Sequence, residues 1–174
     1  MYVCGRKWER VERRVTGVPW LNAEVEHMFL GQYHHNIDSK GRLTIPVRFR
    51  DQLATDGAFI TQGFDQNLMV LTKQSFEEIY QRVNQLSMTS NMARILKRLI
   101  FSNANQVDVD KAGRILIPQY LRSAAVLDGE AIVVGVGDYI EIWSPGLWEK
   151  QIVQLQDAEA NSQRFEALDL SPGI

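Results

Sequence analysis

The chain has 174 residues and a net charge of −2, with 45% hydrophobic and 23% charged residues. These values are ordinary for a globular protein of one large or two small domains, and no apolar run reaches the roughly 18 residues of a membrane-spanning helix. A single cysteine, Cys4, excludes an intramolecular disulfide. Because the chain is mildly acidic, any site for a polyanion has to be a local cluster of cations.

The first 27 residues differ in character from those that follow. They carry five Lys or Arg and four Glu without a helix or strand period, and they lack the apolar centre of a secretory signal. Met28 then opens a segment with the pattern of a strand. We expect residues 1–27 to be a disordered extension, and a basic arm that contacts nucleic acid is the alternative.

A 15-residue segment occurs twice in the chain, as NIDSKGRLTIPVRFR at residues 36–50 and as DVDKAGRILIPQYLR at residues 108–122. Six aligned positions are identical, where average composition gives about one by chance. The identical pairs are Asp38/Asp110, Gly41/Gly113, Arg42/Arg114, Ile45/Ile117, Pro46/Pro118 and Arg50/Arg122. We therefore predict an internal duplication, with repeat 1 at residues 32–80 and repeat 2 at residues 104–150.

Both copies predict the same elements in the same order. A strand runs into an Asp-x-x-Gly-Arg turn and a second strand follows, with predicted bounds of 29–37 and 42–45, then 104–109 and 114–117. A proline ends the second strand and opens a short helix, at residues 47–53 and 119–127. A hairpin follows in each copy, and longer helices close the units near residues 73–87 and 145–157.

A further helix is predicted between the copies. Ser90 is a suitable N-cap, and an apolar stripe within residues 95–100 lies opposite basic side chains. Residues 158–174 are polar, and we expect a flexible tail.

The size of one unit favours joining the two. Four short strands and two helices cannot bury enough apolar surface alone, whereas two units can interleave their strands into one closed barrel. The expected fold class is α+β, mainly β, with pseudo-two-fold symmetry and short flanking helices. Trp143 and Trp148 match apolar positions of the first copy, so we expect them in the core.

The first turn brings two cations to a tight tip. Gly41 can adopt the positive φ of a tight hairpin, and Asp38 can accept hydrogen bonds from backbone N–H groups. Lys40 and Arg42 then project, where Arg can fork onto guanine and Lys can contact phosphate. A short β-ribbon carrying such cations can enter the DNA major groove.

The second copy repeats this device with Asp110, Lys111, Gly113 and Arg114. The alternative is a solvated hairpin tip in which the Arg pairs with the Asp of its own turn. A structural turn needs the Asp and the Gly, but it does not need the same Arg in both copies. The duplication therefore favours a DNA-binding role for Lys40, Arg42, Lys111 and Arg114.

The segments DSKGRLTIP and DKAGRILIP resemble the SpoVT/AbrB class of DNA-binding domains. Two such segments at this spacing, with MFLGQYHHNID before the first and RLIFSNA before the second, resemble the MraZ family. The resemblance covers Met28 to about Leu155. It implies an AbrB-like swapped-hairpin barrel made from two half-units in one chain.

The resemblance also implies a function. Members of this family are bacterial, nucleoid-associated transcriptional regulators of the cytoplasm that form homo-oligomeric rings. They bind direct repeats in double-stranded promoter DNA upstream of the division and cell-wall gene cluster, usually repressing that cluster and themselves. No cofactor, metal, membrane or enzymatic activity is implied. Two departures stand out, because Ala112 replaces the Lys40 of the first copy and residues 1–27 have no place in the family pattern.

Three alternatives remain open from the residues. A small metal-dependent enzyme is disfavoured because His34 and His35, adjacent on a predicted strand, point to opposite faces, and no common catalytic motif occurs. A DNA-independent ring-forming module would use the apolar stripe of residues 95–100 for subunit packing. A recognition helix would instead use the basic residues of the same segment, which are Arg94, Lys97 and Arg98.

Overall fold

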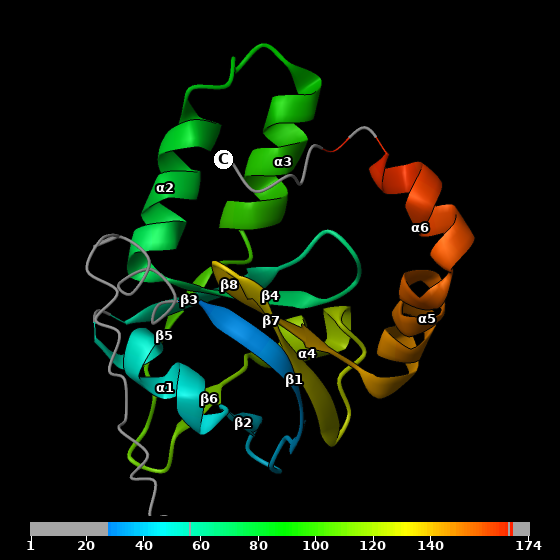
Figure 1. Ribbon diagram of the computed structural model, residues 1–174. Helices are drawn as coiled ribbons and strands as arrows, with labels where there is room; N and C mark the ends of the chain where they lie inside the picture. The colour runs from blue at the N-terminus through cyan, green and yellow to red at the C-terminus, as the bar shows by residue number, and fades with distance from the viewer. Residues whose placement is uncertain (1–27, 56, 167, 169–174) are drawn as a thin grey trace, which may run out of the picture.

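The computed structural model describes residues 28–55, 57–166 and 168 (Figure 1), so the predicted extension at residues 1–27 lies outside the described residues. Repeat 1 forms β1 (Phe29–Asn36), β2 (Arg42–Thr44), α1 (Val47–Ala54), β3 (Ala58–Gln62), β4 (Leu68–Thr72) and α2 (Lys73–Asn84). Helix α3 (Asn91–Phe101) connects the repeats. Repeat 2 forms β5 (Asn105–Val107), β6 (Arg114–Leu116), α4 (Gln119–Ala124), β7 (Glu130–Gly137), β8 (Tyr139–Trp143) and α5 (Pro145–Gln156), and α6 (Ala158–Phe165) follows.

The two repeats interleave their strands within one antiparallel sheet. Its order is β1-β7-β8-β4-β3-β5, which maps onto itself when each strand is exchanged for its equivalent in the other repeat. The first strand of each repeat pairs with the third strand of the other, and the two fourth strands, β4 and β8, meet at the centre. This arrangement is the predicted pseudo-two-fold exchange between tandem units.

The remaining strands, β2 and β6, form a separate two-stranded ribbon. Leu43 faces Ile115 across the pair, and both side chains are fully buried, while the residues on either side point outward. The α+β class is confirmed. Among the described residues, however, the large sheet ends at β1 and β5, so the strands form two sheets in place of one closed hydrogen-bonded barrel.

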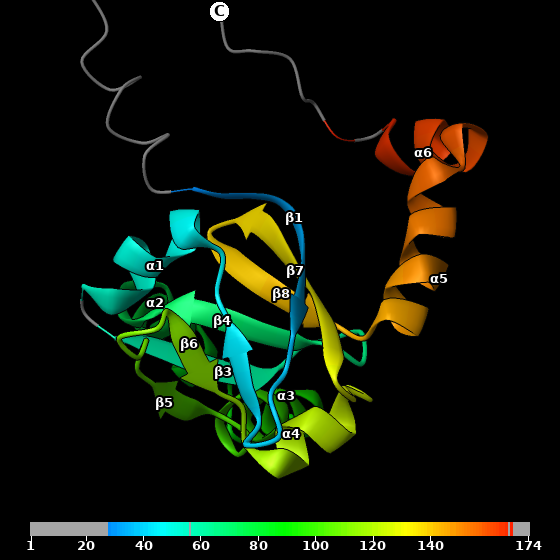
Figure 2. The same cartoon turned by 90° about the horizontal axis from the view of Figure 1, so that it is seen from below.

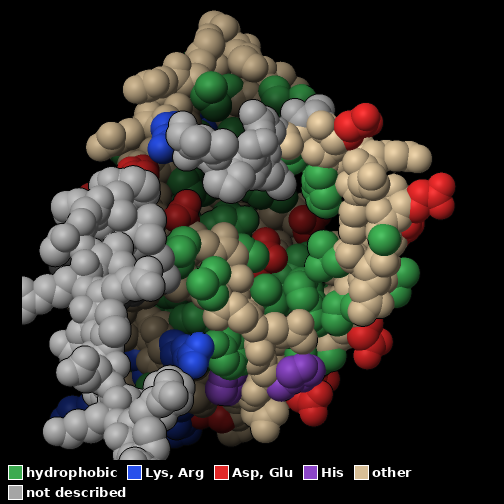
Figure 3. Space-filling model, viewed as in Figure 1, with side chains coloured by type: hydrophobic (Ala, Val, Ile, Leu, Met, Phe, Trp, Pro, Cys, Tyr) green, Lys and Arg blue, Asp and Glu red, His purple; other side chains and the backbone are tan. Residues whose placement is uncertain are grey.

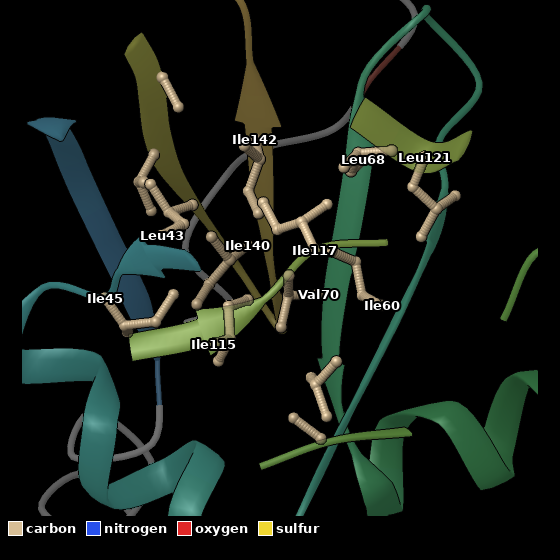
Figure 4. Packing of buried hydrophobic residues seen from close by; sticks show 14 of the residues in the cluster. Leu43, Ile45, Ile60, Leu68, Val70, Ile115, Ile117, Leu121, Ile140 and Ile142 are labelled. Carbon is tan, nitrogen blue, oxygen red and sulfur yellow. The ribbon is translucent and has the colours of Figure 1, made fainter. Parts of the chain in front are cut away.

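One hydrophobic core lies between the ribbon and the large sheet. Figure 4 shows its side chains converging from both repeats, with Leu43 and Ile45 meeting Ile115, Ile140 and others. Phe49 adds edge-to-face contacts with Phe29, at 5.2 Å between ring centroids, and with Tyr33 at 5.3 Å. Because both halves contribute to the same core, neither repeat buries its apolar face alone.

The longer helices pack on the large sheet. The rings of Phe59 in β3 and Phe76 in α2 stack at 4.3 Å, and buried Thr61 donates a 2.6 Å hydrogen bond to the Ile100 carbonyl at the end of α3. Trp143 and Trp148 are buried in a second cluster under α5, as predicted. No helix in the described ranges combines the length and the apolar character needed to cross a bilayer.

Helix termini follow the expected chemistry, with one addition. Ser90 caps α3 by accepting a hydrogen bond from the Ala93 amide, as predicted. The prediction of a flexible tail from residue 158 did not include a helix, whereas the structure has α6 there. Asp157 caps α6 through a 3.0 Å hydrogen bond from the Ala160 amide. This N-cap favours a helix start that the polar composition of the tail did not indicate.

Candidate nucleic-acid interface

The first turn is closed by the side chain of Asp38. One carboxylate oxygen accepts hydrogen bonds from the backbone amides of Lys40 and Arg42, both at 3.0 Å. The other oxygen accepts from the Arg42 guanidinium, with contacts of 2.7 Å from Nε and from Nη2. Gly41 has φ of +80°, and its amide donates to the Asp38 carbonyl at 2.8 Å. The hydrogen bond from the Arg42 amide is the main cause that lowers the pKa of Asp38.

The second turn repeats this geometry. Asp110 accepts from the amides of Ala112, at 2.8 Å, and Arg114, at 3.0 Å. The Arg114 guanidinium donates to the other oxygen from Nε at 3.0 Å and from Nη2 at 2.7 Å. This side-chain hydrogen bond is the largest cause that lowers the pKa of Asp110 to about 2. Arg114 also approaches the carboxylate of the first turn, with 3.7 Å between its Nη1 and Asp38 Oδ2.

Each turn is held by the opposite repeat. The Gly41 carbonyl accepts a 2.9 Å hydrogen bond from the Ile117 amide, and the Gly113 carbonyl accepts a 2.8 Å bond from the Ile45 amide. These two bonds extend the β2–β6 ribbon at both ends, so the two turns flank one ribbon.

Two further arginines lie against the turn glycines, also across the repeats. Arg50 donates to the Ile45 carbonyl at 2.8 Å, and a Cβ added at Gly113 would lie 2.2 Å from its guanidinium carbon. Arg122 donates to the Ile117 carbonyl at 3.2 Å and lies over Gly41, where an added Cβ would be 3.0 Å from its Nε. Glycine is therefore required here for positive φ and for space.

The predicted DNA-contacting side chains divide into two kinds. Arg42 and Arg114 are paired with the aspartates of their turns, as the alternative interpretation held, and their side chains are 32% and 29% exposed. They are neither free nor closed off from solvent. Lys40 and Lys111 are exposed at the two turn tips. The structure thus fixes the two arginines and leaves the two lysines extended into solvent.

Arg50 and Arg122 are also members of this site and were not predicted, although both belong to the repeated segment. Their identity in the two copies was the signal that could have found them. We call the six cations Lys40, Arg42, Arg50, Lys111, Arg114 and Arg122, with the carboxylates of Asp38 and Asp110, the turn cluster. Six cations against two carboxylates make this region basic within a chain of net charge −2.

The outer face of the ribbon belongs to the same surface. Arg42 and Thr44 alternate with buried Leu43 on β2, and Arg114 and Leu116 alternate with buried Ile115 on β6. Apart from Leu116, which is 56% exposed, the outer face of the ribbon is polar, and a turn lies at each end. A two-stranded ribbon of this kind has the width to enter a DNA major groove.

The alternative sites receive less support. His34 and His35 both border a surface hollow of about 330 Å³, but the described residues contain no group of three His, Cys, Asp or Glu that could hold a metal. Burial, then the charge of Arg50, lowers the pKa of His35. On α3, the Arg94 guanidinium donates to the carbonyls of the α2–α3 loop, at Met88 and Thr89. Figure 1 places α3 at the opposite end of the molecule from the β2–β6 ribbon.

Comparison with known proteins covers both repeats. The family model described as MraZ protein matches residues 28–99 and again residues 100–170. A Roseiflexus castenholzii protein named transcriptional regulator MraZ is 46% identical over 134 residues, which span 77% of this chain and 92% of that protein. Proteins of the same name from Herpetosiphon aurantiacus and Moorella thermoacetica are 43% and 42% identical, over 75% and 82% of this chain and 90% and 100% of their own. These matches confirm the resemblance predicted from the two turn motifs.

Proposed function

This chain belongs to the MraZ family, and from that premise we propose that it binds duplex DNA through the turn cluster and regulates transcription. The names of its relatives describe regulators, and the chain is a regulator and not an enzyme. The observation that carries the proposal is the doubled turn, which gathers six cations around one ribbon in an acidic chain.

Different members of the turn cluster suit different contacts. Lys40 and Lys111, exposed at the tips, are suited to phosphate as point charges. Arg42 and Arg114 are held in one orientation by their aspartates, which lowers the entropy lost when a guanidinium meets a base edge or a phosphate. Arg50 and Arg122 add charge beside the turns. Each turn and the arginine that the other repeat places over its glycine form one half of the DNA-binding surface, so both repeats, at residues 32–80 and 104–150, contribute to each half.

Self-assembly completes the proposal. One copy offers few phosphate contacts, and such binding is weak at physiological salt. Several copies on tandem direct repeats raise the affinity through effective concentration. We therefore include a homo-oligomeric ring that binds promoter repeats, represses its own operon and the division and cell-wall genes, and resides with the nucleoid in the cytoplasm.

A binding titration tests this function. The full chain is titrated by fluorescence anisotropy into duplex DNA from upstream of its own gene and into a shuffled duplex, at several salt concentrations. We expect tighter binding to the upstream duplex and a steep loss of affinity with salt. Arg42→Ala and Arg114→Ala should each weaken binding, while Arg98→Ala on α3 should not. Full affinity in Arg42→Ala with loss in Arg98→Ala would place the site on α3 instead.

A further inference from the structure

An apolar groove lies on the face of the large sheet opposite the ribbon. Its walls come from α2 and α3, through Ile79, Val83, Leu96 and Ile100, and its volume is about 260 Å³. Figure 3 shows hydrophobic side chains gathered in the hollow between the α2–α3 hairpin at the top and α5–α6 on the right. Ligand pockets usually enclose about 300–1,000 Å³, so this smaller surface groove suits inserted side chains better than an enclosed ligand.

The second feature is the arm formed by α5 and α6. Helix α5 is anchored by Trp148, but α6 has no buried residue among its eight. Val153 is 70% exposed, and Leu155 and Phe165 are also exposed. A polar helix with exposed apolar residues and little burial of its own gains stability chiefly from a partner surface.

The charges of the two surfaces are opposite. The α2–α3 hairpin, residues 73–101, contains five Lys or Arg and two Glu, whereas the arm, residues 145–166, contains four Asp or Glu and two Lys or Arg. Arg82, whose side chain is 81% exposed, lines the groove and also lies 3.7 Å from Glu78 on the same helix, within reach of both Glu78 and a partner. At the β8 end of the groove, the acidic residues Asp65, Asp138 and Glu141 lie near Tyr139. The positive charge that is complementary to the arm is therefore confined to the α2–α3 side of the groove.

We propose that the α5–α6 arm of one copy inserts its exposed apolar side chains into the α2–α3 groove of a second copy. The inference rests on the self-assembly included in the proposed function and names the two surfaces that carry it. Such a contact joins different patches of identical chains, so it is head-to-tail and either closes into a ring or continues as a filament. Opposite charge on the two surfaces sets the register and disfavours arm-to-arm pairing.

The arm of the same chain is a poorer occupant. Trp148 fixes the start of α5 over β7 and β8, and Figures 1 and 2 both show α6 standing away from α2 and α3. Filling the groove from within would require α5 to leave its buried site. A second copy meets the groove without that loss.

Mixing two defective chains tests the proposal. The arm variant carries Val153→Glu and Phe165→Ser. The groove variant carries Phe64→Ser and Arg82→Glu, because Phe64 also lines the groove, and all four side chains are exposed. Sedimentation velocity of the full chains should give assemblies of several subunits for the wild type and monomers for each variant. An equimolar mixture should form a one-to-one dimer and nothing larger, because one intact arm meets one intact groove. Val47→Ser, an exposed site on α1, is the control and should keep the wild-type size.

Several results would overturn the inference. They are a monomeric wild type, an arm or groove variant that retains the wild-type size, or a mixture that stays monomeric while circular dichroism shows both variants folded. Failure of the proposed function looks different. The monomeric variants retain the turn cluster, so they should bind DNA at least tenfold more weakly yet still in a salt-dependent way. Wild-type assemblies without any salt-dependent DNA binding would reject the regulator and leave the arm-and-groove contact standing.

Discussion

The two turns share a backbone and differ in their cations. Both close on an aspartate that accepts two amides and a guanidinium, and both have a glycine with positive φ. The first turn carries Lys40 one residue before its glycine, whereas the second has Ala112 there and carries Lys111 one residue earlier. Arg114 also approaches the carboxylate of the first turn, whereas Arg42 makes no such ion pair with Asp110 among the described residues.

This difference distinguishes the residues that fix the turn backbone from the exposed lysines that can contact DNA. Aspartate, glycine and arginine recur in both copies because they form one closed hydrogen-bonded unit. The lysines shift because an exposed point charge on a flexible stem tolerates a change of position. The closed unit therefore holds both turns and their arginines in one geometry, and the lysines are where the DNA contacts of the two repeats diverge.

The largest expected effect is on the free energy of unfolding, and it tests whether the ribbon core beneath both turns unfolds as one unit. Leu43 and Ile115 face each other in the ribbon and are fully buried. Leu43→Ala and Ile115→Ala should each lower the free energy of unfolding by about 2–5 kcal/mol. Urea denaturation at fixed protein concentration should show one transition for each variant. A second transition confined to the mutated repeat would mean that the two halves unfold separately.

The glycines distinguish the turns at a smaller scale. Gly41, Gly113 and Gly129 have φ of +80°, +75° and +75°, so alanine at each should cost about 1–2 kcal/mol of backbone strain. The space for an added Cβ differs between these glycines. At Gly113 the Cβ would lie 2.2 Å from Arg50, whereas at Gly129 no atom lies within 4 Å of it. Gly113→Ala should displace Arg50 from the Ile45 carbonyl and cost about 1 kcal/mol more.

Gly129→Ala is the matched control, since it introduces the backbone strain of positive φ without a steric clash between the new Cβ and a neighbouring side chain. All three variants are compared by urea denaturation. Equal losses in the three variants would show that Arg50 moves aside freely and does not hold the second turn.

Much of this architecture was accessible from the sequence, because it depends on local rules repeated twice. The roles open to Asp38 and Gly41 and the cap at Ser90 follow from residues close in the chain, and the duplication follows from identities between residues 36–50 and 108–122. Arg50 over Gly113 did not follow, since this contact joins residues 63 positions apart and arises only when the repeats exchange strands. Nor did α6, because its cap at Asp157 is local but its polar composition carries no helical stripe.

The lysines should change DNA binding without changing stability. Lys40→Ala removes one cation from the first turn, and Ala112→Lys adds one to the second at the matching position. If each lysine contacts one phosphate, the slope of log affinity against log salt should fall by about 0.9 in the first variant and rise by about 0.9 in the second. Anisotropy titrations at four salt concentrations measure both slopes. An unchanged slope in Lys40→Ala would remove that turn tip from the interface.

The smallest expected effect is the loss of stability at low pH that follows from the lowered pKa of Asp110. The Arg114 hydrogen bond lowers the pKa of Asp110 to about 2 from an ordinary value of 3.8. A carboxyl group whose pKa falls on folding stabilises the folded state above its unfolded pKa, and this contribution is lost as the pH drops through about 2. Carbon-detected NMR of the Asp110 carboxyl should show its midpoint near 2 in the wild type and closer to 3.8 in Arg114→Ala. Asp38 should respond in the same direction to Arg42→Ala but by less, since the variant removes only the guanidinium and keeps the backbone amide, which is the larger cause of the lowered pKa. A midpoint for Asp110 that does not move in Arg114→Ala would mean that the backbone amides alone hold the carboxylate, and the arginine would then be free to turn fully towards DNA.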